Sequence, residues 1–194
     1  MPLTGLLLAA GAARRFGANK LLATLPDGQT VGLLAAARLA TVVERMVVVV
    51  RASDDNTARA FQDGGYRVVR CAQAELGMAH SLACGVAASR DSAGWMVALA
   101  DMPLISGATL SALTACWRRE DRIVVPICAG QAGHPVIFPA RFGAELLTLE
   151  GDRGARLVLD AHRDELFAFA TDDSGVLRDI DTPADLVAAT QADP

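Results

Sequence analysis

A stretch near the N-terminus combines small residues with three cationic side chains. Residues 8–20 read Leu-Ala-Ala-Gly-Ala-Ala-Arg-Arg-Phe-Gly-Ala-Asn-Lys, so Arg14, Arg15 and Lys20 follow Gly11 within nine residues. Small residues let backbone N–H groups approach a phosphate closely. Lys20 is the single lysine of the sequence, and a compact ammonium group on a flexible stem serves where a planar guanidinium does not. The pattern favours a phosphate-binding loop over the ordinary alternative, a flexible loop with solvated charges.

Two acidic segments carry carboxylates suited to a divalent cation. Asp101 directly follows the apolar run at residues 95–100, where a buried strand would end, and Asp179 and Asp181 lie in the segment Arg-Asp-Ile-Asp-Thr-Pro. If residues 176–181 are extended, Asp179 and Asp181 share one face because side chains alternate along a strand. Magnesium binds one or two protein carboxylates together with phosphate oxygens. We favour Asp181 over Asp179 as the partner of Asp101; a turn or a helix-capping role is the alternative for each.

Three glycine-containing segments further along the chain are candidates for contact with ligands. Residues 77–85 open a predicted helix that contains Ser81, and free N–H groups at a helix start bind anions and polar groups. His134 lies in Gly-His-Pro and has no second ligand at helical spacing, which argues against a metal site there. Arg153 and Arg156, in Gly-Asp-Arg-Gly-Ala-Arg, are able to pair with an anion, and a turn with solvated arginines is the alternative.

The elements that must position these residues alternate between strands and helices. Short apolar runs predict strands at residues 5–10, 46–50, 66–70, 95–100, 123–128, 166–170 and 176–180, with a short extended segment at 135–138. Amphipathic stretches predict helices at residues 31–39, 54–61, 81–89, 106–119, 140–149 and 155–162. Ser53 is the expected N-cap of the second helix, and Thr182-Pro183-Ala184-Asp185 is a capping box that opens a final one. The alternation indicates βαβ units and a mainly parallel sheet, whose ligands bind beyond the carboxyl ends of its strands.

Composition narrows the class of protein. The 194 residues, 52% of them apolar, indicate a single domain at residues 1–194 with a substantial core. The net charge of −4 argues against a general surface for nucleic acid or anionic membranes. The four cysteines lack the spacing of a zinc module, and no apolar run is long enough to span a bilayer. Because residues 6–13 lack the basic start of a signal peptide, we expect a cytoplasmic protein.

The motif L-A-A-G-x-x-x-R-F-G-x-x-K resembles the signature of the molybdenum cofactor cytidylyl- and guanylyltransferases, the molybdopterin nucleotidyltransferase family. Gly11, Arg15, Gly17 and Lys20 all fall in register with it. The resemblance covers nearly the whole chain and implies an α/β architecture, a three-layer Rossmann-like nucleotidyltransferase fold with a mostly parallel central sheet. In that family the loop wraps a nucleoside triphosphate.

The resemblance also implies roles for the candidate residues. Those implied in nucleotide binding are Leu8, Ala9, Ala10, Gly11, Arg15, Lys20 and Ser81. Those implied in catalysis are Arg15, Lys20 and Asp101, and those implied as Mg2+ ligands are Asp101 and Asp181. Those implied on the pterin side are His134, Arg153 and Arg156. The sequence departs from the family at Ala13, where Ser or Gly is common, and at Cys71, where Asn is frequent.

The implied activity joins CMP from CTP to the phosphate of molybdenum-bearing molybdopterin and releases pyrophosphate. CTP is favoured because Ala9-Ala10-Gly11 resembles the cytidylyl form and the Cβ of Ala10 narrows the base pocket. The alternatives are a guanylyltransferase that uses GTP, another small-phosphate nucleotidyltransferase, and a non-catalytic module that delivers the cofactor to a molybdoenzyme. A molybdoenzyme acceptor is a further candidate partner. An NAD-binding oxidoreductase is not expected, because the glycine spacing does not fit G-x-G-x-x-G.

Overall fold

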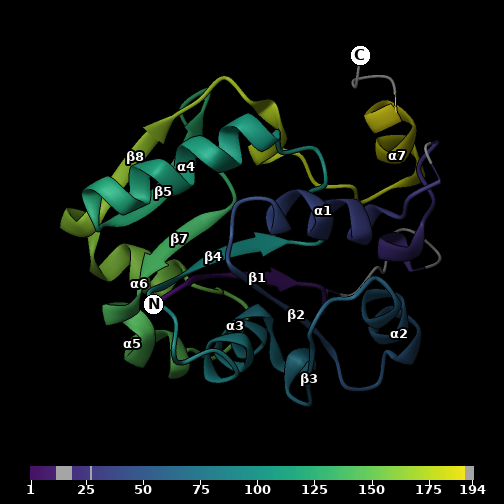
Figure 1. Cartoon of the computed structure of the whole chain (residues 1–194), viewed down its shortest axis with the longest axis horizontal. Coiled ribbons are helices and arrows are strands. Elements are labelled where there is room, and N and C mark those ends of the chain that lie inside the picture. The colour runs from purple at the N-terminus through teal and green to yellow at the C-terminus, as the bar shows by residue number, and fades with distance from the viewer. Residues whose placement is uncertain (12–18, 27, 191–194) are drawn as a thin grey trace.

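A twisted sheet forms the centre of the molecule (Figure 1). The computed structural model describes residues 1–11, 19–26 and 28–190. Within them the sheet has eight strands in the order β3-β2-β1-β4-β7-β5-β6, with β8 paired to β5. The strands are β1 Leu3–Leu8, β2 Arg45–Arg51, β3 Val68–Cys71, β4 Gly94–Leu99, β5 Ile123–Cys128, β6 Gln131–Ala132, β7 Val136–Pro139 and β8 Leu166–Ala170.

Helices connect most of these strands. The α-helices are α1 Val31–Ala40, α2 Asp55–Asp63, α3 Met78–Ala87, α4 Gly107–Glu120, α5 Gly143–Leu147, α6 Arg156–Ala161 and α7 Pro183–Thr190. Short 3-10 turns are η1 Lys20–Leu22, η2 Ala74–Leu76, η3 Ala140–Phe142, η4 Arg163–Glu165 and η5 Ser174–Leu177. No helix among the described residues is both long and apolar enough to cross a membrane.

The sheet is mostly parallel, as the strand–helix alternation predicts. Strand β1 pairs in parallel with β2 and β4, β2 with β3, and β5 with β8. The exceptions are β6, which pairs antiparallel with β5, and β7, which lies antiparallel between β4 and β5 and pairs Val97 with Val136. Because β7 is reversed, the residues that precede it lie at the edge where β4 ends.

Apolar side chains alternate between the two faces of the sheet and give a three-layer α/β fold. On β1, Leu3 and Leu7 join a core with side chains of α1, α2 and α4, whereas Leu6 and Leu8 join a core with α3, α5 and α6. Figure 1 shows α1 and α4 on one side of the sheet and α3 and α5 on the other. The run 47–50 on β2 is buried throughout because helices cover both faces.

Three local expectations are corrected by the structure. The N-cap of α2 is Asp54, not Ser53, because the Asp54 carboxylate accepts the Thr57 N–H at 3.0 Å. The expected strand at 176–180 is wrong: Ser174–Leu177 form η5, since the Asp173 carboxylate accepts the Gly175 N–H at 2.9 Å and turns the backbone, and residues 178–180 belong to no strand. The expected helix at 140–149 is η3 followed by the short helix α5.

Candidate active site

The ammonium group of Lys20 lies between two carboxylates at the carboxyl edge of the sheet. Its Nζ donates to Asp101 Oδ2 at 2.7 Å and to Asp181 Oδ1 at 2.5 Å. The side chain of Lys20 is 9% exposed, against 22% for Asp101 and 37% for Asp181. Burial lowers the pKa of Lys20, but the hydrogen bonds to the two carboxylates outweigh it and raise that pKa above its usual value. Lys20 is therefore charged at neutral pH and compensates the two acids.

Local sequence fixes the position of this lysine. Asn19 is the N-cap of η1, and its side-chain oxygen accepts the Leu21 N–H at 3.2 Å. The Asn19 amide nitrogen donates to Asp54 at 3.1 Å and to Thr57 at 2.6 Å. One asparagine thus ties the turn that carries Lys20 to the start of α2.

The two acids come from segments far apart in the sequence. Asp101 follows β4, and its carbonyl accepts the Ile180 N–H at 2.8 Å. Asp181 precedes the capping box that opens α7, where Asp185 accepts N–H groups from Asp181 at 3.1 Å and Thr182 at 2.7 Å. The capping box predicted from the sequence is confirmed, and it holds Asp181 beside Asp101.

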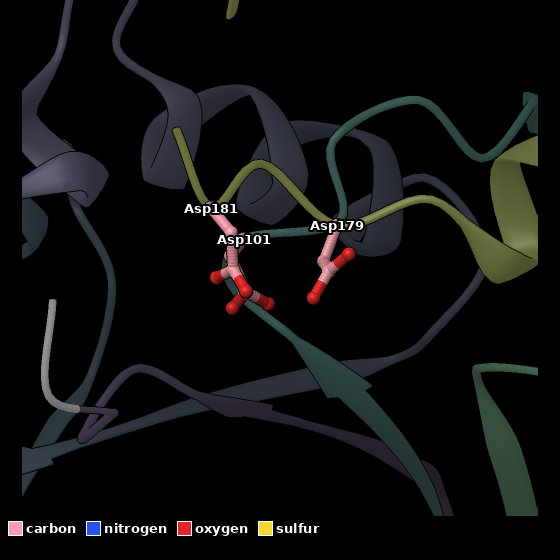
Figure 2. Close-up of side chains that lie close together, drawn as sticks. All are labelled: Asp101, Asp179 and Asp181. Carbon is pink, nitrogen blue, oxygen red and sulfur yellow. The ribbon is translucent and has the colours of Figure 1, made fainter. Parts of the chain in front are cut away.

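A third carboxylate joins this pair. Oxygens of Asp101, Asp179 and Asp181 lie within 4.8 Å of one another, and Figure 2 shows the three side chains directed into the same space. Hard cations such as Mg2+ and Mn2+ prefer oxygen ligands of this kind. The donor set fits a divalent cation, and Asp179, the less favoured of the two acids in the sequence, lies within the same cluster.

A cavity of about 410 Å3 opens beside the lysine and gathers the residues expected on the nucleotide side. Its lining includes Leu8, Ala9, Ala10, Gly11, Lys20, Ser81 and Asp101. Arg15, expected to bind the phosphates and act in catalysis, lies outside the described residues, as does Gly17.

The same cavity contains charged residues that the sequence reasoning did not single out. Arg51 is the last residue of β2, and its Nε donates to the Ala10 carbonyl at 2.7 Å, which holds the start of the glycine loop. Glu75 and Asp152 also line the cavity. For Arg51 a signal was available, since it directly follows the strand predicted at 46–50, at the edge where a parallel sheet binds its ligands.

A second cavity of about 580 Å3 adjoins the first. His134, Arg153 and Arg156, the three residues expected on the pterin side, all line it. Leu8 and Met78 line both cavities. Burial lowers the pKa of the His134 imidazole, with the Val97 carbonyl and the charge of Asp101 opposing the shift, so the ring is neutral at pH 7. Apart from its charged residues, this cavity is mainly apolar.

One loop separates the two cavities. The Gly151 carbonyl accepts the Ala79 N–H at 3.0 Å, so the loop crosses the start of α3. Gly77 allows this approach, because a Cβ there would lie 2.2 Å from the Gly151 oxygen and its φ of +130° is strained for other residues. Past this contact the chain places Asp152 in the first cavity and Arg153 in the second.

Comparisons with known proteins identify relatives of this chain. The model of the MobA-like NTP transferase domain family matches residues 5–166. Purine catabolism protein PucB of Bacillus subtilis (strain 168) is 34% identical over 195 residues, covering 93% of this chain and 92% of PucB.

Among solved structures, Rv0371c of Mycobacterium tuberculosis H37Rv has a TM-score of 0.83 at 25% identity, with 99% of each chain covered. A complex of Rv0371c with manganese has a TM-score of 0.76 at 24% identity, with 100% of each chain covered. Molybdopterin-guanine dinucleotide biosynthesis protein A of Archaeoglobus fulgidus has a TM-score of 0.75 at 18% identity, with 97% of each chain covered.

Proposed function

The chain belongs to the MobA-like NTP transferase domain family and is a nucleotidyltransferase, and from that premise we propose that it transfers CMP from CTP to the phosphate of molybdenum-bearing molybdopterin. Pyrophosphate is the second product. The family resemblance supports the acceptor, and so does the fold shared with the Archaeoglobus molybdopterin-guanine protein.

The observation that best supports this function is the pair of adjoining cavities. The first contains the glycine loop, Lys20 and Asp101, and the second contains His134 and Arg153. Two substrates that must react with each other need neighbouring sites with a shared boundary. Met78 and the end of β1 supply that boundary.

The reaction is an in-line displacement at phosphorus. A phosphate oxygen of the acceptor forms a bond to the α-phosphorus of CTP, and the bond from that phosphorus to the β-phosphate bridging oxygen breaks. The electron pair leaves with pyrophosphate, so no covalent enzyme intermediate is required. Because both reactants are anions, the enzyme must position them and offset their repulsion.

The residues of the candidate site have different tasks in this scheme. Lys20 supplies a fixed positive charge beside the phosphates, and Arg15 is proposed to add a second one. Because the Ala9 N–H donates to the Val49 carbonyl at 2.8 Å, the N–H groups of Ala10 and Gly11 are the ones proposed to orient phosphate oxygens. Asp101 and Asp181, with Asp179 nearby, are proposed to hold Mg2+. When bound, such an ion neutralises phosphate charge and orients the triphosphate.

The proposed preference for CTP rests on Ala10, which is among the residues that line the first cavity. A Cβ at this position narrows the space for a base and favours a pyrimidine over a purine. Calorimetric titration of CTP and of GTP in the presence of Mg2+ tests this choice. Tighter binding of GTP would make the protein a guanylyltransferase on the same site.

The test of the whole proposal is Asp101→Asn. Removal of one electrostatic contact of this kind typically lowers the rate by about 10²–10³. We expect pyrophosphate release from CTP and molybdopterin to fall by that factor while the circular dichroism spectrum stays unchanged. Near-normal turnover by the variant would remove Asp101 from the mechanism. If wild-type protein binds molybdopterin but never releases pyrophosphate, it is a delivery module instead.

A further inference from the structure

Two cysteines lie where α3 packs against β3. Cys71 is the last residue of β3, and Cys84 lies on α3. Both belong to the core between α3 and the sheet, where Cys71 is buried and Cys84 is partly buried. The other two cysteines of the sequence, Cys116 and Cys128, belong to the core on the opposite face of the sheet. Cys71 and Cys84, both free thiols, are therefore the pair that the fold brings together on this face.

The two thiols are in direct contact. The Cys71 Sγ donates to the His80 carbonyl at 3.6 Å. His80 precedes Cys84 by one helical turn, and side chains on a helix lean toward its N-terminus, so the Cys84 thiol lies over the turn that Cys71 contacts. Burial, a hydrogen bond to the Cys71 side chain and the charge of its thiolate form together raise the pKa of Cys84 to about 11. At neutral pH Cys84 is therefore a protonated thiol that is hydrogen-bonded to its neighbour.

The chain between the two cysteines forms one wall of the first cavity. The residues of this segment that line the cavity are Ala74, Glu75, Gly77, Met78 and Ser81. A bond between the two sulfur atoms would close this whole wall into a ring. Because the Gly151 oxygen lies against Gly77, the wall has little room to absorb a shift at either end.

We propose that Cys71 and Cys84 form a reversible disulfide, and that this bond weakens nucleotide binding in the first cavity. Neither cysteine takes part in the proposed transfer reaction, so the pair is available for a separate role. Formation of the disulfide is independent of the proposed function. Its effect on binding rests on the proposed function, which assigns the first cavity to the nucleotide.

The oxidant is a small-molecule disulfide such as oxidised glutathione. Cys84, the more exposed of the pair, loses its proton, and the thiolate attacks one glutathione sulfur, which breaks the glutathione S–S bond and expels one glutathione thiolate. Cys71 then loses its proton, and its sulfur attacks the Cys84 sulfur and expels the second glutathione thiolate. The two released thiolates take up the two protons. Two cysteines are thus oxidised to one disulfide, and one glutathione disulfide is reduced to two thiols.

The disulfide changes the cavity wall because it is shorter than the contact that it replaces. A sulfur–sulfur bond of about 2.05 Å is much shorter than a hydrogen bond between thiols, so the end of β3 and α3 must draw together. The hydrogen bond from Cys71 to the His80 carbonyl is lost, because a disulfide sulfur carries no hydrogen. Ser81, which lines the cavity, directly follows His80. A displacement of about 1 Å at a site can cost about 10² in rate, and we expect the Kd of the nucleotide to rise about tenfold.

Peptide mapping tests whether the disulfide forms. The full chain is incubated with millimolar oxidised glutathione at about pH 8.5, where more of the Cys84 thiol is ionised, and is then alkylated and digested with trypsin. No Arg or Lys lies between residues 71 and 89, so both cysteines stay in the peptide 71–90. This peptide should escape alkylation and weigh less than its reduced form by two hydrogens, and dithiothreitol should restore both alkylation sites. A peptide alkylated at both cysteines, or one that carries only bound glutathione, overturns the proposal.

Titration of CTP and of GTP, each with Mg2+, tests the effect on binding. Oxidation should raise the Kd of the nucleotide that wild-type protein binds, and dithiothreitol should reverse the change. Cys84→Ala and Cys71→Ala should each give the same Kd under oxidising and reducing conditions. Cys116→Ala is the matched control, because Cys116 is a buried cysteine of the opposite core, and it should respond as the wild type does. A disulfide that leaves the Kd unchanged, or an equal response by Cys84→Ala and Cys71→Ala, refutes the effect on binding.

The two measurements separate this proposal from the proposed function. If the disulfide forms but the reduced protein binds neither CTP nor GTP, the proposed function fails and so does the effect on binding, while the disulfide stands. If the reduced protein binds and turns over CTP but the peptide 71–90 never loses two hydrogens, the disulfide alone is refuted.

Discussion

Replacement of Lys20 by methionine should destabilise the protein and make its stability depend on a divalent cation. Methionine keeps the unbranched stem but removes the ammonium that pairs with Asp101 and Asp181. The three carboxylates of the cluster then face one another without the lysine charge. A divalent cation that binds these carboxylates supplies the positive charge that the lysine no longer provides.

The size of the effect follows from the exposure of the partners. Breaking a fully buried ion pair costs about 3–5 kcal/mol, whereas an exposed pair contributes about 0–1 kcal/mol. Lys20 is 9% exposed but Asp181 is 37% exposed, so we expect an intermediate loss. A loss of about 2–3 kcal/mol in the free energy of unfolding corresponds to about 4–12 °C in Tm for a chain of this size.

The assay is thermal unfolding of the wild type, Lys20→Met and the control Arg118→Met, each with EDTA and with millimolar MgCl2 or MnCl2. Arg118→Met removes an ion pair whose side chains are 55% and 49% exposed, and it should change Tm little. The cation should raise the Tm of Lys20→Met by more than it raises that of the wild type. Equal Tm values for Lys20→Met and wild type in EDTA, or an equal response to the cation, would refute the reasoning.

Two further substitutions test the loops that shape the site. Gly77→Ala places a Cβ 2.2 Å from the Gly151 oxygen, at a backbone φ of +130° that is strained for alanine. We expect the free energy of unfolding, measured with urea, to fall by at least about 2 kcal/mol. We also expect weaker binding of both substrates in titrations. Asp173→Ala should cost about 2 kcal/mol at pH 7, because the Asp173 carboxylate accepts N–H groups from Ser106 and Gly175. Burial raises the pKa of Asp173, but these hydrogen bonds outweigh it and lower that pKa, so the stabilisation is present above the unfolded-state pKa and is lost as pH falls through the folded-state pKa. Urea unfolding at pH 7 and pH 3 should show a smaller difference between wild type and Asp173→Ala at pH 3, and an equal difference at both would contradict it.

The parts of the site that depend on local pattern were predictable from the sequence. Asp101 ends an apolar run, and the edge of a parallel sheet is where such a residue meets a ligand. The capping box at 182–185 is a contiguous signal, and it held Asp181 where expected. The extended segment expected at 176–180 is a turn instead, because Asp173 and Gly175 bend the backbone through contacts that apolar periodicity does not reveal.

The parts that depend on tertiary convergence were not predictable. Asp160, on the short helix α6, and Arg163, in η4 beyond its end, look like ordinary surface charges. Nothing in their spacing shows that Arg153 reaches the same carboxylate across a loop. The direct contact of Lys20 with two candidate metal ligands, Asp101 and Asp181, was also not predicted. The sequence pattern indicated that this lysine contacts the phosphates. Contacts between side chains that are far apart in the sequence can be identified only once the fold is known.

The reversed strand β7 has a consequence for how proteins with this architecture diversify. In a purely parallel sheet, only the residues that follow each strand lie at the edge where ligands bind. Here the residues that precede β7, Gly133-His134-Pro135, lie at the edge of the sheet where Asp101 follows β4. Under the proposed function, residues that follow β1 and β4 bind the triphosphate, and residues that precede β7 contribute to the acceptor pocket. Under that proposal, substitutions in the segment before β7 can alter the acceptor pocket and leave the nucleotide pocket unchanged.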